Sequence, residues 1–272
     1  MDRVCNIPVA SPSAPDLIQD LLVANGEMLP VQALCRAGAL IGLSESAIRV
    51  ALTRLARQGK ITHWARGCYA LNLSGPALSR TVDDWQHTEP HTVAWSASWL
   101  GVQDTGVLRS DKTGWRRHCL ALSLRGFRLF QPGLHLRPDN LAGGATSVRK
   151  QLLGLGLAPQ AVVFRLDELD DARQAEALAL WEMEKLSNQY RQMQQALKSS
   201  ARKFGSTDLE AAVRESLLLG RAVIGQLIRD PLLPSEMTAS KARQSLTQEM
   251  KVYQDKARVL WRKWLNLPYR RL

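Results

Sequence analysis

Residues 42–59, GLSESAIRVALTRLARQG, determine how the first part of the chain folds. Ser44 is a favourable N-cap, and Gly59 ends the segment. Between them, four apolar residues follow the i, i+3, i+4, i+7 spacing that buries one face of a helix: Ile48, Ala51, Leu52 and Leu55. The sequence therefore predicts an amphipathic helix over residues 45–58.

Two more predicted helices precede this segment, and two short predicted strands follow it. Residues 16–24 have apolar side chains at helical spacing, and residues 31–40 follow Pro30, which suits a helix N-terminus. Residues 61–64 and 68–71 have the pattern of strands around the turn Ala65-Arg66-Gly67. This order predicts a winged helix-turn-helix over residues 1–78.

The rest of the chain is expected to contain two further domains. After a polar linker at residues 79–90, strand patterns lie at 92–102, 127–130, 134–136 and 161–166, with helical patterns at 111–124 and 144–155. That βαββαβ order predicts a ferredoxin-like domain over residues 91–168. Helical patterns at 172–202, 208–229 and 235–264 predict an all-helical C-terminal domain over residues 169–272. The expected fold class is α+β.

The charge of the chain favours a polyanionic partner. The formal net charge is +11 and the pI is near 9.9, and Lys and Arg that neutralise phosphates release counterions. Residues 1–75, 76–170 and 171–272 carry net charges of +2, +2 and +7. The excess is therefore largest away from the predicted winged helix, although residues 36–75 hold six basic residues and only one acid, Glu45.

The sequence gives no sign of membrane insertion, secretion or disulfide formation. No run of about 18 apolar residues occurs, and the first thirty residues lack the apolar region of a signal peptide. The four cysteines are scattered without a C-x-x-C pair: Cys5, Cys35, Cys68 and Cys119. We expect a cytoplasmic protein with reduced cysteines, no metal and no cofactor.

The side of the predicted third helix opposite the apolar stripe carries groups that suit DNA. Arg49 is the expected base reader, because an arginine can bridge O6 and N7 of guanine. Arg54 and Arg57 lie later in the helix and suit phosphates, and Arg66 is at the tip of the wing. The expected DNA-binding set is Ser44, Ser46, Arg49, Thr53, Arg54, Arg57 and Arg66. Two alternatives remain: a basic helix face that is only solvated, and a winged helix that docks another protein.

The segment 42–55 resembles the recognition helix of the PaaX-like family, the repressors of phenylacetic acid degradation operons. Further landmarks of the resemblance follow in order: Trp95-x-x-x-Trp99, Gly126-Phe127, Arg137-Pro138 with Asn140-Leu141, and Arg229-Asp230-Pro231-Leu232-Leu233-Pro234. The resemblance implies a repressor of aromatic-acid catabolism genes that binds double-stranded operator DNA as a homodimer. It also implies release by a small effector such as phenylacetyl-CoA or another acyl-CoA.

The effector site is expected to combine apolar walls with a few polar anchors. The residues that fit this description are Trp95, Trp99, Trp181, Tyr190 and Arg229. Taken singly, each aromatic residue in that set is expected to be a core residue rather than part of a binding site. The acyl group of the effector is not fixed by the sequence.

An enzymatic function is the main alternative to a DNA-binding repressor, and we expect no enzymatic activity. A metal-dependent nuclease built on a ferredoxin-like domain needs a carboxylate at the end of its first strand, and residues 92–100, TVAWSASWL, contain none. Asp104 is expected to be a turn residue. His87 and His91 flank Pro90, which breaks the helix that would align them for a metal, and the adjacent His118 and Cys119 do not face each other on a helix.

Overall fold

The computed structural model describes residues 2–4, 7–9, 11–25, 28–72, 92–237 and 240–266. By its contacts the chain divides into two compact units. Unit 1 comprises Met1–Asp83, Gln192–Gly225 and Ser245–Leu272, and unit 2 comprises Asp84–Arg191 and Gln226–Gln244. The expected linker at residues 79–90 lies outside the described residues. The protein is α+β, as the sequence predicts.

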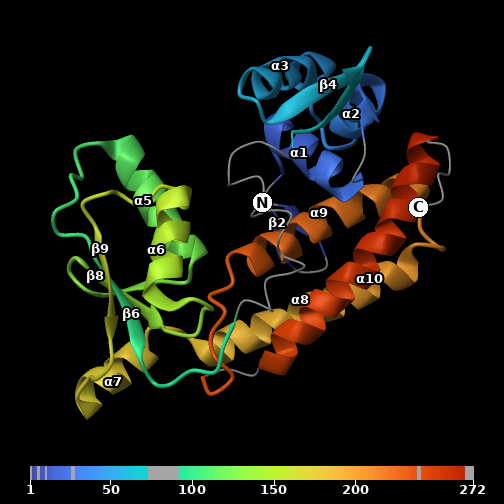
Figure 1. The fold of residues 1–272 in the computed structure, drawn as a ribbon. Coiled ribbons are helices and arrows are strands. Elements are labelled where there is room, and N and C mark those ends of the chain that lie inside the picture. Colours follow the sequence, from blue (N-terminus) through green and yellow to red (C-terminus); the bar gives the residue numbers. More distant parts are fainter. Residues whose placement is uncertain are drawn as a thin grey trace. The chain divides into compact units, whose positions relative to one another are not determined.

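Unit 1 begins with three helices and a small antiparallel sheet (Figure 1). The helices are α1 (Ala14–Asn25), α2 (Val31–Leu40) and α3 (Glu45–Arg57). The sheet has the order β3-β5-β4, from β3 (Leu29–Pro30), β4 (Ile61–Ala65) and β5 (Cys68–Leu71). A separate strand pair, β1 (Asp2–Val4) and β2 (Ile7–Val9), precedes α1. Strand β3 was not expected from the sequence.

Helices α2 and α3 approach each other closely at one glycine. A Cβ atom built on Gly38 of α2 would lie 2.8 Å from Cγ1 of Ile48 on α3. Ile48 is fully buried, so the absence of a side chain at residue 38 is what allows the two helices to pack at this distance. The short connection between them includes Gly42, whose φ of 82° suits glycine.

The core of unit 1 is completed by residues from the far end of the chain. The buried stripe of α3 packs with α1 and α2 in one hydrophobic cluster. That cluster also contains Val213 and Leu217 of α9 (Leu209–Ile228) and Trp264 of α10 (Ser240–Leu265). The guanidinium carbon of Arg36 on α2 lies 4.3 Å from the centre of the Trp264 ring. The three amino-terminal helices therefore share one core with α9 and α10.

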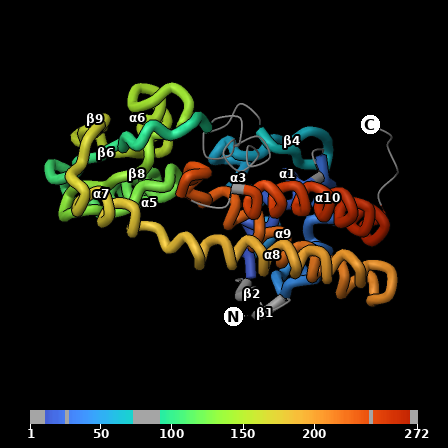
Figure 2. The backbone as a smooth tube through the Cα atoms, turned by 90° about the horizontal axis from the view of Figure 1, so that it is seen from below, coloured from blue at the N-terminus to red at the C-terminus, as the bar shows by residue number. Residues whose placement is uncertain are grey.

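Within unit 1, α9 and α10 also pack with the end of α8 (Met183–Lys203), as Figure 2 shows. The hydroxyls of Ser200 on α8 and Tyr253 on α10 are 2.9 Å apart. The indole N–H of Trp261 on α10 donates to Oγ of Ser216 on α9, at 3.1 Å. These bonds between buried groups fix the neighbouring helices to one another.

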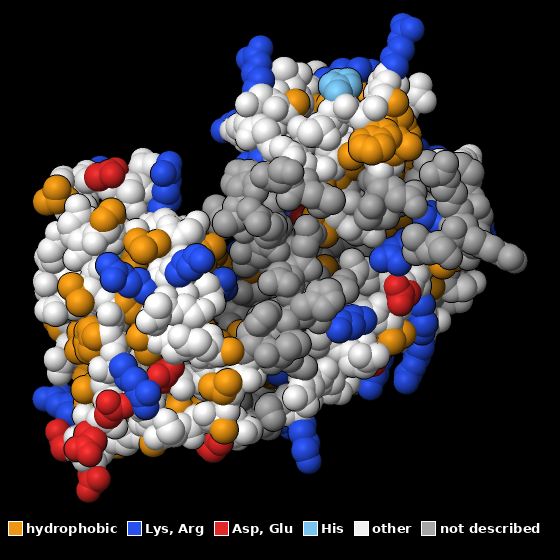
Figure 3. Space-filling model, viewed as in Figure 1, with side chains coloured by type: hydrophobic (Ala, Val, Ile, Leu, Met, Phe, Trp, Pro, Cys, Tyr) orange, Lys and Arg blue, Asp and Glu red, His pale blue; other side chains and the backbone are white. Residues whose placement is uncertain are grey.

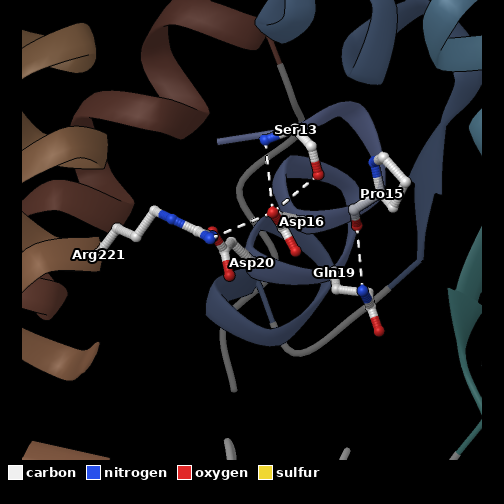
Figure 4. Close-up of polar contacts among 6 residues, drawn as sticks. All are labelled: Ser13, Pro15, Asp16, Gln19, Asp20 and Arg221. Carbon is white, nitrogen blue, oxygen red and sulfur yellow. Dashed lines mark hydrogen bonds and ion pairs between the residues drawn. The ribbon is translucent and has the colours of Figure 1, made fainter. Parts of the chain in front are cut away.

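Helix α1 is joined to α9 by an ion-pair cluster, drawn in Figure 4. The guanidinium of Arg221 on α9 pairs with the carboxylate of Asp20, and it lies 3.4 Å from Oδ2 of Asp16. Asp16 also accepts a hydrogen bond from the hydroxyl of Ser13, at 2.7 Å. Burial raises the pKa of Asp20 above its ordinary value, and Arg221 opposes this rise.

Unit 2 contains a four-stranded antiparallel sheet with the order β7-β8-β6-β9. Its strands are β6 (Trp99–Gln103), β7 (Arg128–Gln131), β8 (Leu134–Pro138) and β9 (Val162–Leu166). Helices α5 (Lys112–Leu124) and α6 (Gly144–Leu155) share a core with Leu100 and Val102 of β6. Because side chains alternate along a strand, Trp99 lies on the opposite face, where it packs near α7 (Asp171–Leu178).

Three predicted elements differ from those observed. The strand expected at 92–102 begins only at Trp99, because Ala97 has a φ of 63° and the indole of Trp95 donates to the carbonyl of Ser98, at 2.6 Å. The helix expected at 172–202 is two helices, α7 and α8, and the break between them brings Trp181 into the cluster around Trp99. Helix α10 begins at Ser240 rather than at residue 235.

Candidate nucleic-acid interface

Helix α3 has one buried and one exposed face. Its N-cap, Ser44, accepts a hydrogen bond from the backbone N–H of Ala47 at 3.2 Å, and its hydroxyl lies 3.0 Å from that of Ser46. Four residues are buried: Ile48, Ala51, Leu52 and Leu55. Seven others are exposed: Glu45, Ser46, Arg49, Val50, Thr53, Arg54 and Arg57. All the residues that the sequence assigns to base or phosphate contact on this helix therefore lie on its solvent side.

Arg49 is exposed but already engaged. Its Nε donates to Oε1 of Glu45 at 2.8 Å, and a second guanidinium nitrogen lies 2.6 Å from the same oxygen. Both side chains remain about 60% exposed, at 59% and 63%. The pair spans one helical turn, so Glu45 orients the guanidinium and raises the pKa of Arg49. A guanine that bound Arg49 would have to displace the Glu45 carboxylate or share the guanidinium with it.

The second half of the exposed face surrounds an open hollow of about 430 Å³. It is lined by Val50, Thr53, Arg54, Arg57 and Gln58. The Thr53 hydroxyl donates to the carbonyl of Arg49 at 3.1 Å. It can therefore accept a hydrogen bond from a base but has no second proton to donate to one. The hollow combines two guanidinium groups with an apolar wall.

The β4–β5 hairpin supplies a second exposed surface in unit 1. Arg66 and Gly67 form its turn, and Gly67 has a φ of 74°. Arg66 is exposed, and so is Trp64 on β4, whose relative exposure is 68%. In Figure 3, Lys and Arg side chains project from the part of unit 1 formed by α3 and this hairpin.

Sequence reasoning missed Val50 and Trp64. Val50 is also 68% exposed, which is unusual for a large apolar side chain on a helix with a well-defined buried stripe. Its position two residues after Ile48 was a signal, because residues i and i+2 do not share a helix face. An apolar contact of this kind suits the 5-methyl group of thymine.

Three of the expected effector residues lie together in unit 2. The ring centres of Trp95 and Trp99 are 5.4 Å apart at 80°, and those of Trp99 and Trp181 are 6.1 Å apart at 11°. The Trp99 indole donates to Oε1 of Gln174 at 2.8 Å. Trp181 is 5% exposed, and its Nε1 has no hydrogen-bond partner among the described residues. A buried N–H without an acceptor is costly, and a ligand oxygen would satisfy it.

The other two expected effector residues have different surroundings. The Tyr190 hydroxyl donates to Oδ2 of the buried Asp230. Asp230 also accepts from the backbone N–H of Leu232 at 2.8 Å and pairs with Nε of Arg243 at 3.0 Å. Burial and the neighbouring carboxylate raise the pKa of Tyr190. Arg229 is exposed, next to this network.

The landmarks behind the family resemblance are joined by a second buried network. Arg137 is 1% exposed, and it donates to Oδ1 of Asn140 at 2.8 Å and to the carbonyl of Arg125. Asn140 in turn donates to the carbonyl of Leu232 at 2.7 Å. Burial lowers the pKa of Arg137 to about 9, which still leaves it protonated at neutral pH. These residues hold backbone segments together within unit 2.

Asp104 is not the ordinary turn residue that the sequence predicts. It directly follows β6, is 1% exposed, and its Oδ2 lies 3.2 Å from Nε2 of His118 and 3.0 Å from Nε2 of His135. Nδ1 of His118 accepts from the backbone N–H of Ala158 at 3.2 Å, so a neutral His118 carries its proton on Nε2 and donates to Asp104. Asp104 therefore occupies the strand-end position thought to lack a carboxylate, but it is enclosed by two imidazoles.

Within the described ranges, no group of three or more His, Cys, Asp or Glu side chains is arranged to hold a metal ion. The residues His87 and His91 lie outside those ranges. His118 is buried and Cys119 is exposed, so the two neighbours point to different environments, as their spacing predicts. Cys35, Cys68 and Cys119 are free thiols. Among the described helices, none is both long enough and apolar enough to cross a bilayer.

The comparisons with known proteins bear on the amino-terminal segment and on the fold. The family model described as PaaX-like protein matches residues 16–75, which confirms the predicted resemblance over that segment. The solved structure of the uncharacterized protein Rv0674 from Mycobacterium tuberculosis is similar in fold, with a TM-score of 0.53 and 21% sequence identity. That match covers 90% of this chain and 96% of the other. No curated protein matches the chain.

Proposed function

We propose that the chain is a transcriptional repressor of a catabolic operon that binds operator DNA through α3 and the β4–β5 hairpin. The observation that carries the proposal is the exposed face of α3, where Arg49, Arg54 and Arg57 lie opposite a stripe anchored in the core of unit 1. A helix held in this way presents its polar side to a groove without moving its backbone. The match of residues 16–75 to a family of operon regulators supports the same reading.

The arrangement of elements supports the domain assignment in this proposal. Three helices and a basic-tipped hairpin make a winged helix-turn-helix within residues 1–78. The sheet order β7-β8-β6-β9 with α5 and α6 on one face makes a ferredoxin-like domain within residues 91–168. The proposed helical C-terminal domain is residues 169–272; its helices are divided between the two compact units, and α9 and α10 share the core of α1, α2 and α3. The protein acts in the cytoplasm as a homodimer whose two α3 helices enter major grooves about 34 Å apart, or a multiple of that distance.

Release from DNA follows from a small effector that prefers one geometry of the dimer. The Trp95-Trp99-Trp181 cluster is the proposed aromatic part of its site, because the buried N–H of Trp181 needs an acceptor such as a thioester carbonyl. Tyr190 and Arg229 are the proposed polar anchors; the Tyr190 hydroxyl already donates to Asp230, whereas the Arg229 side chain is exposed. An aryl-CoA thioester such as phenylacetyl-CoA fits this combination of an aromatic ring and an acceptor oxygen.

Selection of genomic DNA fragments tests the DNA-binding proposal. Fragments of the source genome retained by the protein are sequenced, and a duplex containing the shared sequence is used in gel-shift titrations. Arg49→Ala is expected to weaken binding to that duplex about 5- to 150-fold, since one bidentate arginine–guanine contact contributes about 1–3 kcal/mol. Arg202→Ala removes the same charge from an exposed position on α8 in unit 1 and is the matched control.

A result in which no sequence is enriched, or in which Arg49→Ala and Arg202→Ala behave alike, contradicts the proposed reading helix.

The effector proposal has its own test. Phenylacetyl-CoA at about 100 times its Kd should stabilise the folded protein by about 2.7 kcal/mol, seen as a higher Tm than with phenylacetate or CoA. Trp181→Phe, which removes the unpaired N–H, should reduce that shift, and an unchanged shift would place the effector elsewhere.

A further inference from the structure

The outer side of α5 and α6 in unit 2 is strongly basic. The two helices carry five basic residues, all exposed, and no acidic residue: Lys112, Arg116, Arg117, Arg149 and Lys150. We call these five residues the α5–α6 basic face. No carboxylate among the described residues forms an ion pair with any of them. The face therefore has no internal counter-charge.

The fold places these side chains on one surface. Both helices bury their apolar residues against the same face of the sheet, so their exposed residues point away from it. The helices are also close, because a Cβ built on Gly156 at the end of α6 would lie 3.1 Å from Cβ of Arg117 on α5. Arg109 extends the charge beyond the helix, with its guanidinium carbon 4.9 Å from the centre of the Trp115 ring.

Unit 2 separates its charges by element. Residues 105–160 hold nine basic and two acidic residues, whereas residues 167–184 hold one basic and seven acidic residues. The acidic stretch contains α7, and in Figure 3 the red side chains of unit 2 are most numerous at the α7 end. The net charge of +2 for residues 76–170 conceals this separation, because that range contains three of the seven acidic residues of this stretch and four further acidic residues before residue 105. A unit polarised in this way turns its basic side toward a polyanion.

We propose that the α5–α6 basic face binds the phosphate backbone of duplex DNA without reading its sequence. The inference rests on the proposed function, since it gives a second DNA-binding surface to a protein proposed to bind operator DNA through α3. Guanidinium and ammonium groups without base-specific geometry suit phosphates, and such contacts position a protein rather than specify a site. Leu120 and Leu153 on the same helices are 43% and 44% exposed, so a protein partner is the alternative that the test must separate.

The test compares two variants of the full chain that lose equal charge. The face variant is Arg116→Gln, Arg117→Gln, Arg149→Gln and Lys150→Gln. The matched control is Lys185→Gln, Arg191→Gln, Arg202→Gln and Lys203→Gln, on the exposed surface of α8. Both lower the formal net charge from +11 to +7. Binding of a 40-base-pair mixed-sequence duplex is measured by fluorescence anisotropy at several KCl concentrations, after circular dichroism has verified folding.

The face variant is expected to reduce the slope of log K against log[KCl] by about two to four, because each phosphate contact contributes about 0.9. At low salt its affinity should fall at least tenfold below that of the control. Equal slopes for the two variants overturn the inference. The inference is also overturned if the double variant Leu120→Ser, Leu153→Ser changes the oligomeric state measured by light scattering while the face variant leaves the salt slope unchanged. In that case the face contacts protein.

The result is distinguishable from failure of the proposed function. If genomic selection enriches no sequence but the face variant lowers the salt slope, the face binds DNA and the reading role of α3 is wrong. If a sequence is enriched and Arg49→Ala weakens it while the face variant leaves the slope unchanged, the repressor proposal stands and the second contact does not. The face variant should leave the enriched sequence the same, because phosphates carry no sequence information.

Discussion

Gly38→Ala is expected to disturb the packing between α2 and α3 and thereby destabilise α3. The added Cβ would lie 2.8 Å from Cγ1 and 3.0 Å from Cδ1 of Ile48, and Ile48 is fully buried in the core of unit 1. Overpacking of this kind costs about 1–3 kcal/mol. Alanine regains about 1 kcal/mol of helix propensity over glycine, so the net loss is about 1 kcal/mol.

Gly154→Ala provides a matched control near the end of α6. No atom lies within 4 Å of the Cβ that it would gain, so only the helix propensity applies, and α6 should gain up to about 1 kcal/mol. Native-state hydrogen exchange measured on peptides from α3 and α6 reports the two free energies separately. If Gly38→Ala stabilises α3 as Gly154→Ala stabilises α6, the close approach of Gly38 to Ile48 is refuted.

Two further predictions concern buried polar groups of unit 2. Burial lowers the pKa of His135 more than Asp104 raises it, so the folded state binds fewer protons than the unfolded state, and the stability present above pH 6.5 should decline as the pH falls toward the lower folded-state pKa. The difference in Tm between pH 7.5 and pH 5.5 should therefore be smaller in His135→Gln than in the wild type. An equal difference would assign the effect to other groups. Tyr190→Phe removes the hydroxyl that donates to Asp230 and should cost about 1–3 kcal/mol in hydrogen exchange of residues 226–237, whereas no change would mean that Arg243 and the Leu232 N–H satisfy the carboxylate alone.

Local signals in the sequence predict most helices of the chain. Residues 31–40 and 144–155 are observed with the expected bounds, and the cap at Ser44 forms as predicted. These elements are set by caps, glycines and apolar spacing within one or two turns, which a single sequence displays. The start of β6 was missed because it depends on a left-handed residue, Ala97, that carries no glycine signal.

Contacts between residues far apart in the chain could not be predicted from the sequence. Asp104 is enclosed by His118 and His135, which lie 14 and 31 residues away, and no local pattern links these three. The charge separation of unit 2 was not visible in the charge counts, because the boundary at residue 170 divides the acidic stretch of residues 167–184 between two of the counted ranges. By contrast, the Glu45–Arg49 pair has the i, i+4 spacing that a sequence shows directly. The ion pair that engages Arg49, the expected base reader, could therefore have been predicted.

The shared core of unit 1 has a consequence for how the protein is made. Trp264 packs into the same cluster as Leu52 and Leu55, yet the ribosome adds it roughly 190 residues after β5 is complete. At about 5–20 residues per second, this delay is about 10–40 s. During that time the nascent chain displays the apolar surface that Val213, Leu217 and Trp264 later cover. Folding of the segment that contains α3 therefore cannot be completed before Trp264 has been synthesised, and a stop codon that removes α10 also removes part of the core of the amino-terminal helices.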